Sequence, residues 1–154
     1  MKERSLIIIK PDAVNRTIMG EIIHRFERKG LKIVGMKMSH LDEETLGEHY
    51  SHHVGKPFYK NLVKFMMHCP ALMIVLEGND VVEVVRKIAG ETHGAKALPG
   101  TIRGDYSLST QCNIVHASDS VENAKKEISR FFKDNELFDY NRIDTEMIYA
   151  EDER

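Results

Sequence analysis

The stretch ALMIVLEG, from Ala71 to Gly78, is the segment on which the fold assignment depends. Its first six residues are all apolar, a run whose length is typical of a buried strand. The residues after it show a different period, with one helical stripe formed by Val81, Val84, Val85 and Ile88. We therefore predict a buried strand that is followed directly by a helix.

The N-terminal part of the chain has a similar pattern. Leu6–Lys10 is predicted to be a buried strand, and Thr17–Lys29 carries a helical stripe that Gly30 is suited to end as a C-cap. Leu31–Met38 is strand-like, with Gly35 as a possible bulge. These segments form a first βαβ unit.

Two short helices are predicted between this unit and the central strand, over Asp42–His49 and Pro57–Met67, with Pro57 at the first helical position. After the central strand and its helix comes a long loop over residues 90–112, which contains most of the nearby glycines. A last strand over Asn113–Val115 and a helix from about Ser120 to Lys133 follow. A loop of this length inside a small domain is usually functional.

The order βαβ, helical insert, βαβ is the split βαβ pattern of a ferredoxin-like α+β sandwich. It predicts a four-stranded antiparallel sheet with helices on its faces. A doubly wound parallel sheet is the alternative, but it requires more alternating units. With 154 residues, the chain is expected to form a single domain over residues 1–154.

The composition is that of a globular protein, with 42% hydrophobic and 30% charged residues. Because 22 basic residues balance 24 acidic ones, no nucleic-acid partner is predicted, although a local basic pocket for a phosphate remains possible. We find no signal peptide and no apolar run of transmembrane length, so we expect no membrane association and a cytoplasmic location. Cys69 and Cys112 match no metal or redox spacing and are expected to be reduced.

NIVHASDS, from Asn113 to Ser120, places His116 between a strand and a helix N-terminus. A neutral imidazole is nucleophilic when an acceptor holds its second nitrogen. Glu127 borders the inward face of the next helix. A carboxylate at such a position is usually solvated. If it bonds to a histidine at the end of the preceding strand, we expect it to be directed inward instead. Asp119 or Ser120 is expected to cap the helix, with Asp119 and Glu122 resembling a capping box.

The sequence contains neither a Walker A loop nor G-x-G-x-x-G, so the common nucleotide cradles are absent. Instead, Lys10, Arg86 and Arg103 are scattered cations near predicted turns, and Thr92 offers a hydroxyl. Each alone is most simply a surface group. Together they would neutralise a polyphosphate, but their spacing does not show that they converge.

Several motifs resemble the nucleoside diphosphate kinase family in order and near-spacing over Ser5–Tyr149: IIIKPDAV, GEIIHRFERKG, EHY, KPFY, GET, PGTIRGD and NIVHASDS. The resemblance implies the same ferredoxin-like fold. It also implies transfer of the γ-phosphoryl group from a nucleoside triphosphate to a nucleoside diphosphate in a ping-pong reaction through a phosphohistidine on His116. Mg²⁺ would be the cofactor, carried by the nucleotide phosphates, with no metal ligands in the protein.

The resemblance also implies roles for other positions. Glu127 would orient His116, Ser118 would hydrogen-bond to Glu127, and Tyr50 would lie beside the histidine. The remaining implied roles concern the nucleotide. Lys10 and Asn113 would bind the ribose 3′-hydroxyl, and Lys10 would also lie near the phosphates. The phosphates would be bound by Arg86, Thr92 and Arg103, and Phe58 would stack on the base.

The chain departs from the family pattern in three places. GETHG replaces the usual GETNP, Thr110 stands where valine is common, and STQCN lacks a common glycine-arginine pair. His93-Gly94 is expected to make its loop more flexible. Gly94→Pro should therefore raise stability if the local backbone accommodates proline.

The resemblance further implies a homo-oligomer, most often a hexamer and next a tetramer. Because the 90–112 loop is predicted to lack regular structure, neighbouring subunits are expected to order it. Two other functions stay open. One is a metal hydrolase built on His49, His52 and His53, and the other is a catalytically silent binding module.

Overall fold

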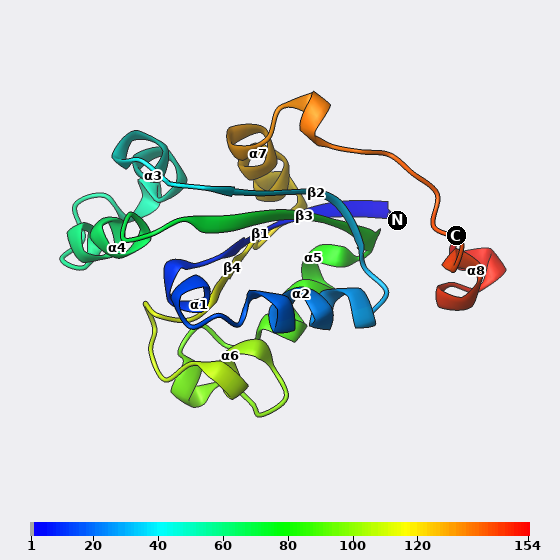
Figure 1. Ribbon diagram of the computed structural model, residues 1–154, viewed down its shortest axis with the longest axis horizontal. Helices are drawn as coiled ribbons and strands as arrows, with labels where there is room; N and C mark the ends of the chain where they lie inside the picture. The colour runs from blue at the N-terminus through cyan, green and yellow to red at the C-terminus, as the bar shows by residue number, and fades with distance from the viewer. Residues whose placement is uncertain (1) are drawn as a thin grey trace.

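The computed structural model describes residues 2–154. Its centre is a four-stranded sheet in the order β2-β3-β1-β4, and every pair of neighbouring strands is antiparallel (Figure 1). The strands are β1 Lys2–Ile9, β2 Lys32–Ser39, β3 Ala71–Asn79 and β4 Val115–Ala117. The predicted ferredoxin-like sandwich is confirmed, and the antiparallel pairing excludes the doubly wound alternative.

Helices cover both faces of this sheet. They are α1 Pro11–Asn15, α2 Met19–Arg28, α3 Glu43–His49, α4 Tyr59–Met66, α5 Val81–Ala89, α6 Ile102–Tyr106, α7 Val121–Phe131 and α8 Thr145–Ile148. Short 3₁₀ turns lie at η1 Ser51–His53, η2 Gly94–Lys96, η3 Asp134–Glu136 and η4 Glu151–Glu153. One core packs α2 and α5 under the sheet, and a second core packs α3, α4 and α7 over it (Figure 1).

The central strands are apolar throughout because both of their faces are covered. In β1, Ile7 and Ile9 enter the core beside α2 and α5, whereas Leu6 and Ile8 enter the core beside α7. β3 alternates between the two cores in the same manner. Side chains of a strand alternate between its faces, so a strand with two buried faces needs a continuous apolar run.

Several predicted boundaries need correction. β1 starts at Lys2 rather than Leu6, since its polar first half pairs with β3, and it ends before Lys10. Pro11 begins the short helix α1, which the sequence did not indicate. α4 begins at Tyr59, so Pro57 does not occupy a first helical position. The irregularity at Gly35 is confirmed, because the pairing of β2 with β3 shifts there.

The start of α7 agrees with one of the two predicted caps. The Ser120 side chain accepts the backbone N–H of Asn123 and is the N-cap. Asp119 instead accepts from the Asn123 side chain, and Glu122 pairs with Lys126, so the predicted Asp119–Glu122 capping box does not form.

The last strand differs from its predicted position by two residues. Asn113 and Ile114 form a tight turn in which the Val115 N–H donates to the Asn113 carbonyl at 2.8 Å. Ile114 has φ +76°, which is rare for a β-branched residue and marks local strain. β4 therefore begins at Val115, and His116 lies in the middle of the strand, opposite Ile8, rather than at its end.

Residues 90–112 are ordered by the chain itself, contrary to the prediction of a structureless loop. Thr101 caps α6 by accepting the Gly104 N–H, and Ile102 is fully buried in the core beside α5. The segment thus has regular structure and core contacts of its own, so the premise that it lacks them was wrong. Sequence periodicity missed α6 because a five-residue helix is too short to show a stripe.

Gly94→Pro is now expected to destabilise the protein. The Gly94 N–H donates to the Ser109 carbonyl at 3.1 Å, a bond that proline cannot make. A Cβ on Gly94 would also lie 2.3 Å from the Ser107 hydroxyl oxygen. The lost bond and the crowding together should lower the free energy of unfolding by about 2–4 kcal/mol. Urea unfolding followed by circular dichroism measures this. Gly20→Ala, at a site with open space and no positive φ, should cost less, and a stabilised Gly94→Pro variant would contradict the packing.

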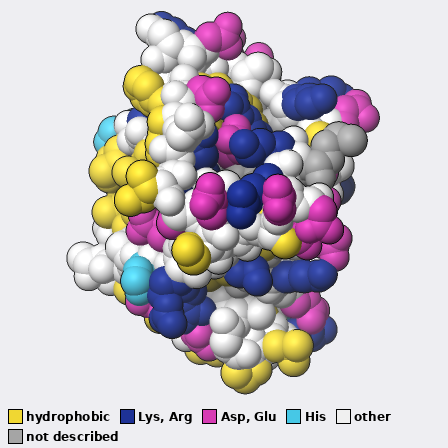
Figure 2. Space-filling model, turned by 90° about the vertical axis from the view of Figure 1, so that its right-hand side faces the viewer, with side chains coloured by type: hydrophobic (Ala, Val, Ile, Leu, Met, Phe, Trp, Pro, Cys, Tyr) yellow, Lys and Arg dark blue, Asp and Glu magenta, His cyan; other side chains and the backbone are white. Residues whose placement is uncertain are grey.

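Basic and acidic side chains are interspersed on the face seen in Figure 2. This face shows no single-sign patch of the kind that binds nucleic acid. Within residues 2–154, no helix combines the length and apolar character needed to cross a membrane.

Candidate active site

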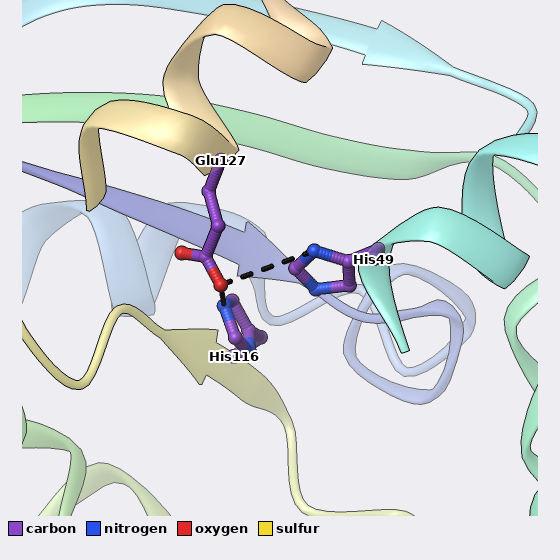
Figure 3. A group of neighbouring side chains, drawn as sticks. All are labelled: His49, His116 and Glu127. Atoms are coloured by element: carbon purple, nitrogen blue, oxygen red, sulfur yellow. Dashed lines mark hydrogen bonds and ion pairs between the residues drawn. The ribbon is translucent and has the colours of Figure 1, made fainter. Parts of the chain in front are cut away.

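His116, Glu127 and Ser118 form one hydrogen-bonded group. His116 Nε2 lies 3.0 Å from Glu127 Oε1, and the Ser118 hydroxyl donates to Glu127 Oε2 at 2.5 Å. β4 supplies His116, and α7 returns over the sheet so that Glu127 points down to it (Figure 3). Ser118 is fully buried beside β1, which anchors the carboxylate.

The charge of Glu127 determines which nitrogen of His116 carries the proton. Burial alone would raise the pKa of Glu127, but the hydrogen bonds from His116 and Ser118 outweigh it and keep that pKa below its ordinary value. The ionised carboxylate can only accept, so Nε2 of His116 is the N–H. When the ring carries a single proton, Nδ1 consequently has the free lone pair.

Two aromatic side chains lie against this group. The His49 ring centroid is 4.6 Å from that of His116 and also 4.6 Å from that of Tyr50. Burial and the charge of Glu127 raise the pKa of Tyr50, so the phenol stays protonated. Its hydroxyl is buried and has no hydrogen-bond partner within the described residues. Tyr50 therefore keeps a donor for a ligand.

A cavity of about 880 Å³ brings the predicted site residues together. Nine of the ten line it: Lys10, Tyr50, Phe58, Arg86, Thr92, Arg103, Asn113, His116 and Glu127. Ser118 is the exception and lies behind Glu127. Thr110, at the position where the family often has valine, also lines the cavity. Residues more than a hundred positions apart in the chain thus share one pocket.

Lys10 is a buried cation at one end of this cavity. Its ammonium donates to Asn113 Oδ1 at 2.7 Å and to the Gln111 carbonyl at 3.4 Å. The Asn113 amide in turn donates to the Thr92 carbonyl at 2.9 Å. Burial, and then the charge of Arg103, lower the pKa of Lys10 to about 8. Lysine has three N–H donors, so one remains for a ligand.

Arg103 connects α6 to the turn before His116. Its guanidinium donates to three backbone carbonyls, those of Gly90 at 2.8 Å, Val115 at 2.7 Å and Asn113 at 3.3 Å. Burial, followed by the charge of Arg86, lowers the pKa of Arg103 to about 10. A guanidinium carries five N–H donors, so two remain available to a phosphate.

Two further residues at the site were not predicted from the sequence. Asp12 Oδ2 accepts the Ile114 N–H at 3.1 Å and so holds the strained turn before His116. Arg130 lines the cavity and lies 3.3 Å from Glu48 and 3.5 Å from His49. A signal for Arg130 existed, because it follows Glu127 by three residues on a helix and therefore shares its face.

The predicted alternative of a metal site made of His49, His52 and His53 is wrong. His52 and His53 lie close together on η1, with their ring centroids 3.9 Å apart, but they do not form a group of possible metal ligands with His49. In the part of the chain that the structure describes, the side chains whose ligand atoms lie close enough to share a metal are His49, His116 and Glu127.

Comparison with known proteins agrees with this geometry. The family model described as "Nucleoside diphosphate kinase" matches residues 3–137. The chain belongs to the nucleoside diphosphate kinase family. The resemblance that the motifs indicated is therefore confirmed, and the chain is a phosphotransferase.

Relatives match along nearly their full length. A nucleoside diphosphate kinase of Parabacteroides distasonis is 52% identical over 151 residues, which cover 98% of this chain and 99% of the relative. One of Pyrococcus horikoshii is 57% identical over 143 residues, covering 91% of each chain. The solved nucleoside diphosphate kinase of Halobacterium salinarum, in complex with CDP, superimposes with a TM-score of 0.94 at 42% identity, covering 97% of this chain and 99% of that one.

Proposed function

We propose that His116 is the nucleophile of a ping-pong reaction in which one domain, residues 1–154, transfers the γ-phosphoryl group of a nucleoside triphosphate to a nucleoside diphosphate. The observation that carries this proposal is the bond from His116 Nε2 to Glu127, which leaves a lone pair on Nδ1. A silent binding module would have no use for an imidazole oriented by a carboxylate in a cavity lined by cations.

The reaction consists of two in-line displacements at phosphorus. In the first, Nδ1 of His116 bonds to the γ-phosphorus, and the bond to the bridging oxygen breaks, so the diphosphate leaves with the electron pair. In the second, a terminal phosphate oxygen of the acceptor diphosphate bonds to the same phosphorus and the P–N bond breaks. The Nε2 proton stays on His116 throughout, held by Glu127.

Charge on the phosphates would be balanced by the cations of the cavity. Three cations line it: Arg86, Arg103 and Lys10. Arg103 and Lys10 keep N–H donors free after their internal hydrogen bonds. Thr92 adds a hydroxyl at the same wall. The phenol of Tyr50 would donate to an oxygen of the phosphoryl group on His116.

Mg²⁺ suits this cavity as a companion of the nucleotide. It prefers oxygen ligands and commonly binds through phosphates, waters and one or two carboxylates. Three carboxylates line the cavity, but Glu127 holds His116 and Glu48 holds Arg130, which leaves Asp119 beside the phosphate-binding cations. We infer that the phosphates carry the ion and that Asp119 would hold it through water. The ion would offset negative charge on the phosphates.

Labelling with γ-³²P-ATP tests the proposal. The chain should acquire label that is lost in acid and retained in base, as expected of a phosphoramidate but not of a phosphoserine. Label that survives acid would contradict a phosphohistidine.

The substrate range follows from the walls of the cavity. Phe58 lines the cavity and is 45% exposed. It would stack on any base, because stacking uses the π-face of the base rather than its hydrogen-bond pattern. Lys10 and Asn113 would hold the 3′-hydroxyl. We expect purine and pyrimidine nucleotides to react within about tenfold of one another, and 3′-deoxynucleotides to lose about 10²-fold in kcat/KM. A steady-state panel measures this, and a strong preference for one base would contradict the arrangement.

We also infer a homo-oligomer, with a hexamer first and a tetramer second. β2 is an edge strand whose Met36 and Met38 side chains are half exposed, and Leu98 and Leu108 are exposed on the 90–112 segment. Such surfaces favour pairing with another subunit. Light scattering after size exclusion should give several times the 17.7 kDa chain mass. A fully active monomer would contradict this inference.

The cytoplasm is the location that we propose. The free cysteines Cys69 and Cys112 fit a reducing compartment. Fractionation of cells would locate the protein, and recovery outside the cytoplasm would contradict the proposal.

A further inference from the structure

A carboxylate oxygen lies between two imidazoles beside the cavity. Glu127 Oε1 is 3.0 Å from His116 Nε2 and 3.9 Å from His49 Nδ1. The three side chains come from α7, β4 and α3 and point toward one another (Figure 3). One ligand atom from each lies within 4.8 Å of the other two.

His49 has no part in the proposed reaction, and its nitrogens are poorly satisfied. Its side chain is 1% exposed, and Nε2 has no hydrogen-bond partner within the described residues. Nδ1 has only a long contact, 3.5 Å, with the Arg130 guanidinium. Packing against Tyr50 and Phe131 accounts for the position of the ring but not for its nitrogens, which are normally hydrogen-bonded when buried.

The electronic state of His49 suits a metal ligand. Its side chain is 1% exposed and its Nε2 has no partner within the described residues, and such burial favours the neutral form of the ring. Because Arg130 can only donate, Nδ1 of His49 carries the lone pair. Nδ1 also lies 3.9 Å from Glu127 Oε1, which is likewise an acceptor. A cation between the two would convert a repulsive contact into two bonds.

We propose that His49, His116 and Glu127 bind a transition-metal cation of the Zn²⁺ class, and that the bound metal blocks phosphoryl transfer. Two imidazoles and one carboxylate, with a position left for water, are a common zinc ligand set. Bonds of about 2.1 Å in a tetrahedral site put ligand atoms about 3.4 Å apart. The 3.0 Å between His116 Nε2 and Glu127 Oε1 is close to this value, whereas His49 Nδ1 would have to approach Glu127 Oε1 by about 0.5 Å and His116 Nε2 by up to about 1.4 Å to complete the site. Mg²⁺, which prefers oxygen ligands, would not compete.

Inhibition follows from the atom that the metal takes, and this step rests on the proposed function. The cation bonds to the lone pair of His116 Nε2, and the proton that Nε2 carried is transferred to Nδ1, so the imidazole stays neutral. Nδ1 then carries an N–H in place of its lone pair and cannot bond to phosphorus. Glu127 bonds the metal and no longer orients the ring as an acceptor.

Arg130 provides a second, opposite test of the site. Its guanidinium is 3.5 Å from the proposed ligand atom of His49 and would repel a cation there. Removing its charge in Arg130→Leu should tighten metal binding about tenfold. Removing a ligand in His49→Asn should weaken it at least about tenfold.

Cobalt absorption measures binding without any assay of activity. Nucleotide-free protein titrated with CoCl₂ should develop the visible band of four-coordinate Co²⁺, saturating at one ion per chain, and Zn²⁺ should abolish it. The band should weaken in His49→Asn, strengthen in Arg130→Leu and stay unchanged in His52→Asn, which alters a neighbouring histidine outside the cluster. No band in the wild type, or equal affinity in all three variants, would overturn the site. If His49→Asn does not fold, the Arg130→Leu comparison decides.

Inhibition is then measured as the rate of phosphoenzyme formation from ATP in excess Mg²⁺. Zn²⁺ should slow wild-type protein, with Arg130→Leu inhibited at lower and His49→Asn at higher concentration. Binding of Co²⁺ and Zn²⁺ without inhibition would contradict the blocking step and count against His116 as nucleophile. Normal phosphorylation with no metal band would contradict the metal site alone.

Discussion

His116→Ala is expected to abolish both labelling by γ-³²P-ATP and steady-state transfer, with kcat/KM reduced on the order of 10⁵-fold. The physical reason is that both halves of the reaction pass through Nδ1, which no other side chain can replace. The ring of His49 lies 4.6 Å from that of His116, but it is buried and its Nδ1 lies 3.9 Å from Glu127 Oε1. Loss of the nucleophile therefore cannot be compensated from within the cavity.

His68→Ala is the matched control, since His68 is exposed and does not line the cavity. It should keep both labelling and transfer. Far-ultraviolet circular dichroism should show that His116→Ala is folded, because the β4 strand keeps its backbone pairing with β1. Transfer by His116→Ala at a rate near that of the wild type would show that the nucleophile has been assigned wrongly.

Glu127→Ala is expected to lower kcat by about 10²–10⁴-fold while changing KM little. Without the carboxylate, nothing selects the tautomer with its proton on Nε2 and its lone pair on Nδ1. The imidazole also loses the contact that fixes its direction. The nucleotide contacts proposed for Lys10 and Arg103 do not involve this carboxylate, so they should be unaffected.

Glu127→Gln separates the two contributions of this side chain. Its amide oxygen can still accept from Nε2, so orientation is kept and only the charge is lost; the decrease should be about tenfold. Glu122→Ala, on an exposed position of the same helix, should stay within about twofold of the wild type. Steady-state kinetics at saturating nucleotide measure all three variants. A Glu127→Ala enzyme with normal kcat would refute the orienting role.

Much of this arrangement was predictable from local patterns. The uninterrupted apolar runs of β1 and β3 identify strands with two buried faces, and the stripes of α2, α5 and α7 identify their helices. His116 and Glu127 are eleven residues apart, separated only by a strand end and a helix start. A chain that leaves a strand and packs back onto it brings such a pair together, so this contact too could be anticipated.

Other features depend on contacts that local patterns do not encode. β4 has only three residues, and its start is set by the Asp12–Ile114 bond, so its position was predicted two residues too early. The 90–112 segment was predicted to be structureless, yet Ile102 and Arg103 fasten it to the core and to the backbone before His116. Gly94 was similarly predicted to make its loop flexible, but the structure packs it directly against Ser107.

The sequence by itself determined which segments form strands and principal helices, and it indicated the side chain that we propose as the nucleophile, because side-chain periodicity and motifs are properties of neighbouring residues. Only the tertiary structure decided that Lys10, Arg103 and His116 share one cavity and that His49 lies against Glu127. The order β2-β3-β1-β4 brings β1 beside β4, and with it Lys10 beside Asn113, although they are 103 residues apart. Strand order is settled by which faces and edges are buried together, and that free energy belongs to the whole fold rather than to any segment.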